Sequence, residues 1–329
     1  MTSDPRPGTL AEPQHSLHIV SGKGGTGKTT IAAALACALA TRGRRVLVCE
    51  VEGRQGIAEA FGVPALVGAE ERRVARTPAG GSVFGLSIDA EDALLEYLET
   101  FYHLGLAGKA LDRFGAIDFA TSIAPGLRDV LLTGKVYEAV GRRLKNRPRS
   151  YDAVVLDAPP TGRISEFLNV HEAVSGLAKM GPIRHQADSI MRMLRSVETV
   201  VHLVTLLEDM PVTETAEAIA GLGPTKIKVA TVIENMVIPS PLDHDQLLAS
   251  ANATAMIEIP GWTPAQNKAL TVELAMEAAR TLEQQLRHDR LRELALPLVQ
   301  VDFDPAGIDA GAILVIANQL RDQLTLEAA

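Results

Sequence analysis

The chain has 329 residues and a formal net charge of −8, with 47% apolar and only 4% aromatic residues. This apolar share predicts a sizeable core of Ala, Val, Leu and Ile, as in parallel sheets that are covered by helices. The acidic balance argues against broad binding to nucleic acid or to an anionic membrane. No apolar run approaches the roughly 18 to 20 residues that span a bilayer.

Residues 1–16 are rich in proline and polar side chains and lack the apolar core of a signal peptide. We therefore expect a disordered tail there and a cytoplasmic location for the protein. The two cysteines, Cys37 and Cys49, fall inside a predicted helix and a predicted strand. Buried, inert thiols are the expected state for both, and a reducing compartment fits them.

The first predicted strand is followed by SGKGGTGKTT, residues 21–30, and then by an alanine-rich helix. Gly22, Gly27, Lys28 and Thr29 fit the phosphate-loop pattern G-x-x-x-x-G-K-[ST]. Glycines let successive backbone N–H groups turn toward phosphate oxygens, and the helix N-terminus adds its positive dipole end. We expect Lys28 to pair with the β- and γ-phosphates and the Thr29 hydroxyl to hold Mg²⁺.

The same loop has a second interpretation, because Gly22, Gly24 and Gly27 also spell G-x-G-x-x-G after a strand. Glu50, at the end of the next predicted strand, lies about where a dinucleotide-binding fold places its ribose-binding acid. The phosphate-loop interpretation is favoured because the loop also supplies the lysine and the hydroxyl residue at the required spacing.

Further strands are predicted at residues 44–51, 83–88, 151–156, 199–207, 226–233 and 296–301, and helices at 91–146, 164–197, 211–222, 264–295 and 308–324. This alternation predicts an α/β fold with a doubly wound, mostly parallel sheet. No internal repeat is visible, so a tandem chain of two such domains is excluded. We expect one domain over residues 17–329, with an embedded helical subdomain made of inserts at about 91–146 and 164–197.

The predicted strand at residues 151–156 ends in Asp157 and runs into the turn APPTG. In a phosphate-loop protein, an acid at this place holds the Mg²⁺ hydration shell, and the following turn senses the γ-phosphate. A turn or N-cap aspartate is the alternative. The buried strand and the upstream phosphate loop favour the metal role for Asp157.

The loop also contains Lys23, which ordinary phosphate loops lack, and GKGGTGK resembles the deviant phosphate loop of dimeric ATPases such as the MinD, ParA and nitrogenase-reductase groups. DAPPTGR, residues 157–163, is similar to the switch motif of the arsenite-pump ATPase (ArsA) family, which includes the ATPase that targets tail-anchored membrane proteins. The resemblance covers residues 17 to about 320. Three further stretches agree with that family in order, at residues 46–61, 124–139 and 232–237.

The resemblance implies a dimer that binds Mg²⁺ and ATP and hydrolyses the ATP. Lys23 would reach across the dimer interface to the partner's nucleotide and stabilise charge in the transition state. Asn235 would read adenine, while Thr29 and Asp157 would serve Mg²⁺. The nucleotide would lie against Gly22, Gly24, Gly25, Thr26, Gly27, Lys28, Thr29 and Thr30, and switch II would comprise Pro159, Pro160, Thr161, Gly162 and Arg163.

The chain departs from the family in switch I, where Glu52-Gly53-Arg54 replaces Asp-Pro-Ala. The family's aspartate positions the attacking water, so Glu52 is the expected catalytic counterpart. Its extra methylene can misplace the carboxylate, and a misplacement of roughly 1 Å can cost on the order of 100-fold in rate. We therefore expect slow hydrolysis unless backbone shifts at Gly53 restore the geometry. Asp304-Pro305-Ala306 spells the missing motif but follows the last predicted strand, so we interpret it as a chance match.

Metal and client binding differ within the resembled family. The cysteines lack the C-x-x-C spacing of a zinc seam, and no His/Cys cluster has ligand spacing, so we expect no zinc site and no arsenite site. In targeting members, the helical inserts form an apolar groove for a transmembrane segment. Met180, Met191 and Met193 would suit such a face for an apolar protein or lipid client, although ordinary packing against the core is the favoured interpretation.

Two other functions remain open beside the leading one. A spatial organiser of the MinD/ParA type needs an amphipathic tail or a basic DNA-binding face, but the C-terminus leans acidic and the only basic cluster, residues 142–149, is expected to be a solvated helix end. No nucleic-acid partner and at most peripheral membrane association are therefore expected. The substitution at Glu52 also fits a weakly active regulatory subunit, so the dimer is either a homodimer or a heterodimer with a related ATPase.

Overall fold

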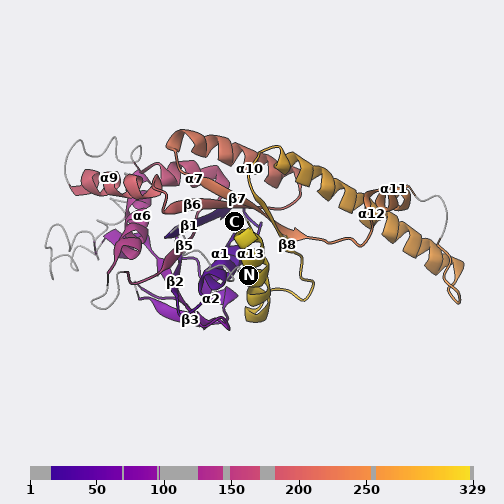
Figure 1. The fold of residues 1–329 in the computed structure, drawn as a ribbon, viewed down its shortest axis with the longest axis horizontal. Coiled ribbons are helices and arrows are strands. Elements are labelled where there is room, and N and C mark those ends of the chain that lie inside the picture. Colours follow the sequence, from indigo (N-terminus) through magenta and orange to yellow (C-terminus); the bar gives the residue numbers. More distant parts are fainter. Residues whose placement is uncertain are drawn as a thin grey trace, which may run out of the picture.

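The computed structural model describes residues 16–68, 70–94, 96, 125–143, 149–170, 182–252 and 257–326. Its strands are β1 (Leu17–Gly22), β2 (Arg45–Val51), β3 (Arg72–Arg76), β4 (Ser82–Ile88), β5 (Ala153–Asp157), β6 (Thr199–Thr205), β7 (Val229–Val237) and β8 (Leu298–Asp302). They form one eight-stranded sheet in the order β3-β4-β2-β5-β1-β6-β7-β8 (Figure 1). Only β3, at one edge, runs antiparallel to its neighbour within this described sheet. The predicted α/β fold with a mostly parallel sheet is confirmed.

The helices are α1 (Lys28–Leu39), α2 (Gly56–Ala60), α6 (Pro125–Gly141), α7 (Thr161–Leu168), α9 (Pro182–Leu194), α10 (Asp209–Leu222), α11 (His244–Ala251), α12 (Pro264–Arg292) and α13 (Ala310–Leu326), with a 3₁₀ turn at Gly223–Thr225. They cover both faces of the sheet, so its central strands are buried on both sides and read as continuous apolar runs. On one face, α1, α2 and α13 pack on the sheet through residues such as Leu35 and Leu320. On the other face, α6, α7, α9 and α10 contribute residues such as Leu132 and Phe167.

Strand β1 lies at the centre of this arrangement, between β5 and β6. All of its residues are buried. Its carboxyl end therefore delivers the glycine loop to the same edge of the sheet at which β2, β5 and β7 also end. In open parallel sheets, ligands bind at this edge, where the strand order reverses direction.

The seven predicted strands are all present, with boundary shifts of a few residues. Three elements were not predicted, namely β3, α2 and α11. Helix α1 begins at Lys28, and α7 begins at Thr161, inside the segment that we expected to be a turn. Ser16, the last residue of the expected tail, is buried and its N–H donates to the Glu198 carbonyl at 2.8 Å.

Parts of the two predicted helical inserts are seen. The first contains α6, and the second contains α9 and most of α7. Residues 1–15 of the expected tail, residues 95, 97–124 and 144–146 of the first insert, and residues 171–181 of the second lie outside the described residues.

Helices α11 and α12 form a hairpin that extends away from the sheet (Figure 1). Both begin with a capping box, in which Asp243 pairs with Gln246 and Thr263 pairs with Gln266. These caps satisfy N–H groups that a helix start would otherwise leave without partners. Across the described ranges, no helix is both long enough and apolar enough to pass through a membrane.

Candidate functional site

The glycine loop curls between the end of β1 and the start of α1. Gly25 and Gly27 have φ angles of 86° and 84°, in the left-handed region that side chains disfavour. Close approach constrains two of the loop's glycines: a Cβ on Gly22 would lie 2.1 Å from the Val204 carbonyl oxygen, and a Cβ on Gly27 would lie 2.4 Å from Asn235 Nδ2. The loop's shape therefore depends on glycine at these positions.

Lys28 folds back over this loop. Its side chain is only 8% exposed, and Nζ donates a hydrogen bond to the Lys23 carbonyl at 3.0 Å. The Thr26 hydroxyl donates to the same carbonyl at 2.9 Å. Burial lowers the pKa of Lys28, and the charge of Asp157 opposes that effect. An anion bound in the loop would add a second negative charge beside this lysine.

Thr29 and Asp157 meet beneath the loop. The Thr29 hydroxyl donates to Asp157 Oδ2 at 2.6 Å. Asp157 is 4% exposed, and burial raises its pKa while Thr29 and Lys28 lower it. Its other oxygen, Oδ1, is buried and has no hydrogen-bond partner within the described part of the chain.

These groups fit the Mg²⁺ ion that the fold implies. A hydroxyl and a carboxylate are the hard oxygen donors that Mg²⁺ selects, and it commonly uses one or two carboxylates together with substrate phosphates. Gly56 packs closely beside them, because a Cβ there would lie 2.9 Å from Thr29 Cγ2. No group of three or more His, Cys, Asp or Glu side chains placed to bind a metal occurs among the described residues.

The candidate switch I acid, Glu52, is held by two arginines. Its Oε1 accepts a hydrogen bond from Arg163 at 2.8 Å, and its Oε2 accepts one from Arg54. Burial opposes its ionisation, but the two arginines outweigh burial and keep the pKa of Glu52 below its ordinary value. Glu52 and Gly53 both adopt left-handed backbone, with φ of 71° and 66°.

Arg163 links both switch segments to α6. Besides contacting Glu52, its guanidinium lies 3.6 Å from Asp129 on α6. The loop and switch II are joined as well, because the Ser21 hydroxyl donates to the Pro159 carbonyl at 2.7 Å. The two expected switches and the helical region are therefore in direct polar contact in this structure.

Lys23, the extra lysine of the loop, points to its own subunit. Its Nζ lies 2.7 Å from Glu214 Oε1 on α10, and both side chains are about one-third exposed. The Thr161 hydroxyl of switch II donates to the other Glu214 oxygen at 3.4 Å. Glu214 thus contacts the loop and switch II together, a role that nothing in the sequence indicated.

Asn235, the expected adenine reader, lies against the loop. Its Nδ2 donates to the Thr26 carbonyl at 2.8 Å, and the residue is 5% exposed. The preceding residue, Glu234, is fully buried and accepts hydrogen bonds from His288 on α12 and from Gln300 on β8, each at 2.8 Å. The loop, β7 and α12 are thereby connected through adjacent residues.

In the dinucleotide interpretation, Glu50 would be the acid that binds a ribose. In the structure it is only 1% exposed. Its Oε2 accepts a hydrogen bond from the Ile57 N–H at 3.1 Å. Burial raises the pKa of Glu50 to about 7, with Asp157 adding to the rise and the Ile57 N–H opposing it. Its carboxylate therefore belongs to the same buried region as Asp157.

The predicted site residues fall into four places at this edge of the sheet. Gly22 ends β1; Gly24, Gly25, Thr26 and Gly27 form the loop; Lys28, Thr29 and Thr30 make the first turn of α1; Pro159 and Pro160 precede α7, and Thr161, Gly162 and Arg163 begin it. Asp304-Pro305-Ala306 follows β8 in an exposed segment. The structure thus brings the loop, both switch segments and Asn235 together.

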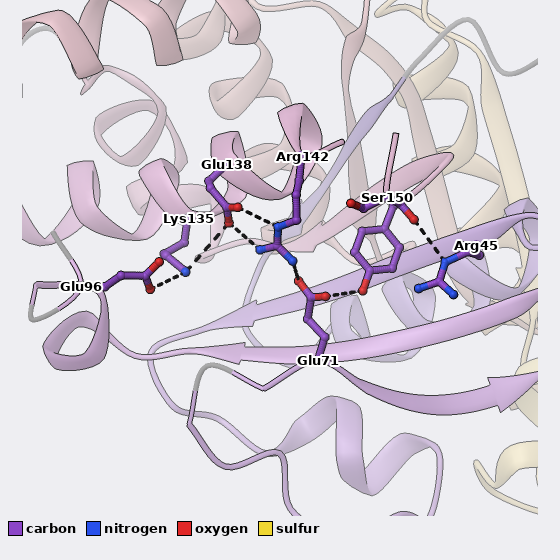
Figure 2. Close-up of polar contacts among 8 residues, drawn as sticks. Arg45, Glu71, Glu96, Lys135, Glu138, Arg142 and Ser150 are labelled. Carbon is purple, nitrogen blue, oxygen red and sulfur yellow. Dashed lines mark hydrogen bonds and ion pairs between the residues drawn. The ribbon is translucent and has the colours of Figure 1, made fainter. Parts of the chain in front are cut away.

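Helix α6 is anchored at its far end by a chain of alternating charges (Figure 2). Lys135 lies between Glu96 and Glu138, and Arg142 contacts both Glu138 and Glu71. Tyr151 donates its hydroxyl to Glu71 as well. Arg142 belongs to the basic run that we expected to be solvated, and in the structure it bridges two carboxylates instead.

Both thiols are buried, and the two described methionines of the expected client face pack in or against the core. Burial raises the pKa of Cys37 to about 12 and that of Cys49 further still. Met191 is buried in the core and Met193 packs against it, while Met180 lies outside the described residues. The two described methionines therefore follow the core-packing interpretation.

Comparison with known proteins agrees with this geometry. Residues 15–200 match the model of a family described as anion-transporting ATPase. The chain is 46% identical over 319 residues to the ATPase BagA of Mycobacterium tuberculosis, covering 93% of each protein. It is 24% identical over 253 residues to a putative arsenical pump-driving ATPase 2 of Aquifex aeolicus, covering 68% of this chain and 81% of that protein. It is 28% identical over 203 residues to the ATPase get3 of Schizosaccharomyces japonicus, covering 58% of each.

Proposed function

The chain belongs to the anion-transporting ATPase family and is an ATPase, and from that premise we propose that it works as an ATP-gated dimer. In this proposal, closure of the dimer around Mg²⁺ and ATP is coupled to a helical subdomain that binds a partner or client. The observation that carries the proposal is the meeting of Lys28, Thr29 and Asp157 under the glycine loop.

The loop would bind the triphosphate through its N–H groups and Lys28. Lys28 would exchange the Lys23 carbonyl for phosphate oxygens, a stronger, charge-assisted interaction. Thr29 and Asp157 would hold Mg²⁺, which neutralises charge on the phosphates when bound. Asn235, next to the loop, would contact the base.

Glu52 would orient the attacking water, and its surroundings support slow turnover. Its carboxylate is occupied by Arg54 and Arg163, so it must leave at least one of them to face the nucleotide. Because Arg163 also contacts Asp129 on α6, the release of Glu52 from Arg163 would change the contacts of α6. ATP hydrolysis would thus be coupled to the helical subdomain through one arginine.

Lys23 would act across the dimer interface. It lies on the exposed side of the loop, and among the described residues its ammonium pairs with Glu214, a partner that solvent reaches. A weakly active regulatory subunit in a heterodimer is the second candidate, and it is favoured by Glu52 with its two arginines.

The client would be an apolar protein or lipid that meets the helical region. We place the protein in the cytoplasm, with at most peripheral membrane association, since its two cysteines are buried free thiols. No nucleic-acid partner, zinc site or arsenite site is part of the proposal. An organiser of the MinD/ParA type has less support, because Arg142 and Arg149 of the basic run are paired with carboxylates.

The proposal is tested with Lys28→Ala and Lys23→Ala, using Lys268→Ala on the exposed face of α12 as the matched control. Calorimetric titration with Mg²⁺ and ATP should show lost binding only for Lys28→Ala. Sedimentation velocity with and without ATP should show lost dimerisation for Lys23→Ala, which still binds ATP. Unchanged ATP binding and turnover in Lys28→Ala would overturn the assignment of the nucleotide site. Native mass spectrometry of the wild-type chain with ATP would distinguish a homodimer from a chain that stays monomeric and needs a related subunit.

A further inference from the structure

Two buried acids lie close together beneath the loop. Glu50 and Asp157 are both almost fully buried, and the charge of Asp157 raises the pKa of Glu50. The cations that act on Asp157 are the buried Lys28 and the exposed Arg54. Burying two carboxylates side by side is costly, so such an arrangement favours a bound cation.

Strand register brings the two acids together. Glu50 on β2 is paired directly with Asp157 on β5, and directly opposite neighbours in a sheet point to the same face. Ser87 on β4 occupies the same register on the other side of Glu50. The carboxylates therefore lie side by side at the ends of adjacent strands, close under the loop.

Asp157 has one oxygen committed and one without a partner. Its Oδ2 accepts from Thr29, and its Oδ1 is buried without a hydrogen-bond partner from any residue that the structure describes. Glu50 Oε2 accepts from the Ile57 N–H, and hydrogen bonds from Ser87 and Gly56 also act on the Glu50 carboxyl. A buried acceptor without a partner destabilises the protein, so Asp157 Oδ1 favours a bound ligand.

Gly56 packs against both Thr29 and Glu50. A Cβ on Gly56 would lie 2.9 Å from Thr29 Cγ2, 3.5 Å from Thr29 Oγ1 and 3.7 Å from Glu50 Oε2. The expected metal-binding hydroxyl and the second acid therefore border the same position, where only glycine fits without a shift of Thr29.

We propose that Glu50 is a second carboxylate of the Mg²⁺ site and faces the cation together with Asp157. This inference rests on the proposed Mg²⁺–ATP site and adds a residue to it. Glu50 is a positioning residue for the metal, distinct from Glu52, whose carboxylate contacts Arg163. The cation would offset the repulsion between two adjacent buried carboxylates, so the metal-free protein carries a cost that metal binding relieves.

Manganese titration tests the proposal on the full chain saturated with ADP. MnCl₂ is the probe, and the free ion is followed by electron paramagnetic resonance. Glu50→Gln keeps the shape and an acceptor for Ile57 while removing the charge, and it should weaken Mn²⁺ binding about 10- to 100-fold. The affinity for ADP without metal should stay within twofold, and Glu59→Gln, an exposed change of the same charge on α2, should keep the Mn²⁺ affinity of the wild type.

A second readout separates this role from a structural one. Without metal and nucleotide, Glu50→Gln should melt at a higher temperature than the wild type, because a buried charge without a cation is removed. A lower melting temperature with unchanged Mn²⁺ affinity would show a structural role and overturn the proposal. If Glu50→Gln does not fold, Glu50→Asp, which withdraws the charge by one methylene, should weaken Mn²⁺ binding by several-fold, and an affinity within twofold of the wild type would overturn the proposal.

The outcomes also separate this proposal from the proposed function. A wild-type chain that binds neither ADP nor ATP would overturn both. Normal nucleotide binding that is lost in Lys28→Ala, together with unchanged Mn²⁺ affinity in a folded Glu50 variant, would overturn only the role of Glu50.

Discussion

Lys23 Nζ lies 2.7 Å from Glu214 Oε1, so the loop's extra lysine is paired inside its own subunit. Both side chains are about one-third exposed. An ion pair this exposed contributes about 0–1 kcal/mol. In the proposed dimer, exchange of Glu214 for a phosphate of the partner subunit would therefore cost little, and the ion pair would hold Lys23 only weakly in the resting state.

Glu214→Gln should favour the ATP-bound dimer, because it removes the resting partner of Lys23. A pair contributing up to about 1 kcal/mol corresponds to a gain of up to about fivefold in the dimerisation constant. Sedimentation velocity over a concentration series with ATP measures this constant. Glu217→Gln, an exposed change of the same charge on α10, is the control. A weaker dimer in Glu214→Gln would instead make Glu214 part of the interface.

Glu52→Gln should reduce turnover far more than binding. The proposed role in orienting water predicts a loss in kcat of about 100-fold or more, with ATP affinity within threefold of the wild type. A coupled phosphate-release assay and calorimetry measure the two quantities, and Glu59→Gln on the exposed side of α2 is the control. Equal losses in kcat and affinity would indicate a structural role for Glu52.

Both thiols should resist modification in the native protein. Burial raises the pKa of Cys37 to about 12 and that of Cys49 further, and only a thiolate reacts rapidly with a disulfide reagent. At pH 8, a chromogenic disulfide reagent should react slowly with the folded chain. In 6 M guanidinium, a concentration that unfolds most domains, it should react rapidly with two thiols. Ser240→Cys, in an exposed segment, supplies the fast-reacting control. Rapid reaction of a native thiol would contradict burial.

His288→Ala should destabilise the fold, because it removes a partner of the fully buried Glu234. Loss of one partner of a buried acceptor costs about 1–3 kcal/mol in the free energy of unfolding. Urea denaturation measures the change. His244→Ala, which removes an exposed hydrogen bond to Gln285, should change stability by less than about 0.5 kcal/mol. Equal effects of the two substitutions would show that the contact between His288 and Glu234 does not contribute to the free energy of unfolding.

Much of the fold and the core of the site could be predicted from the sequence, because both depend on local pattern. Apolar runs gave the buried strands, and parallel strands bring their carboxyl ends to one edge, so Thr29 and Asp157 had to lie close together. The short strand β3, RRVAR, was missed because it is polar and lies at an exposed edge. Its pairing with β4 is a tertiary effect that no local pattern reveals.

Glu50 and Glu214 were missed as partners of the site for a different reason. Glu50 lies beside Asp157 because β2 is the neighbour of β5 in the sheet, and no single segment of the sequence predicts this order of strands. Glu214 approaches Lys23 only because α10 packs beside α7, after about 190 residues of intervening chain. Contacts across such separations follow from the assembled topology.

The contact between Glu234 and His288 joins one end of α12 to the sheet. His288 sits near the end of α12 that meets the sheet, and the run back to Pro264 spans about 36 Å at 1.5 Å per residue. A tilt of about 5° at Glu234 would swing the far end of the helix by roughly 3 Å. Since Asn235 is the next residue along β7, a shift too small to change the loop's hydrogen bonds would be magnified at the outer end of the hairpin.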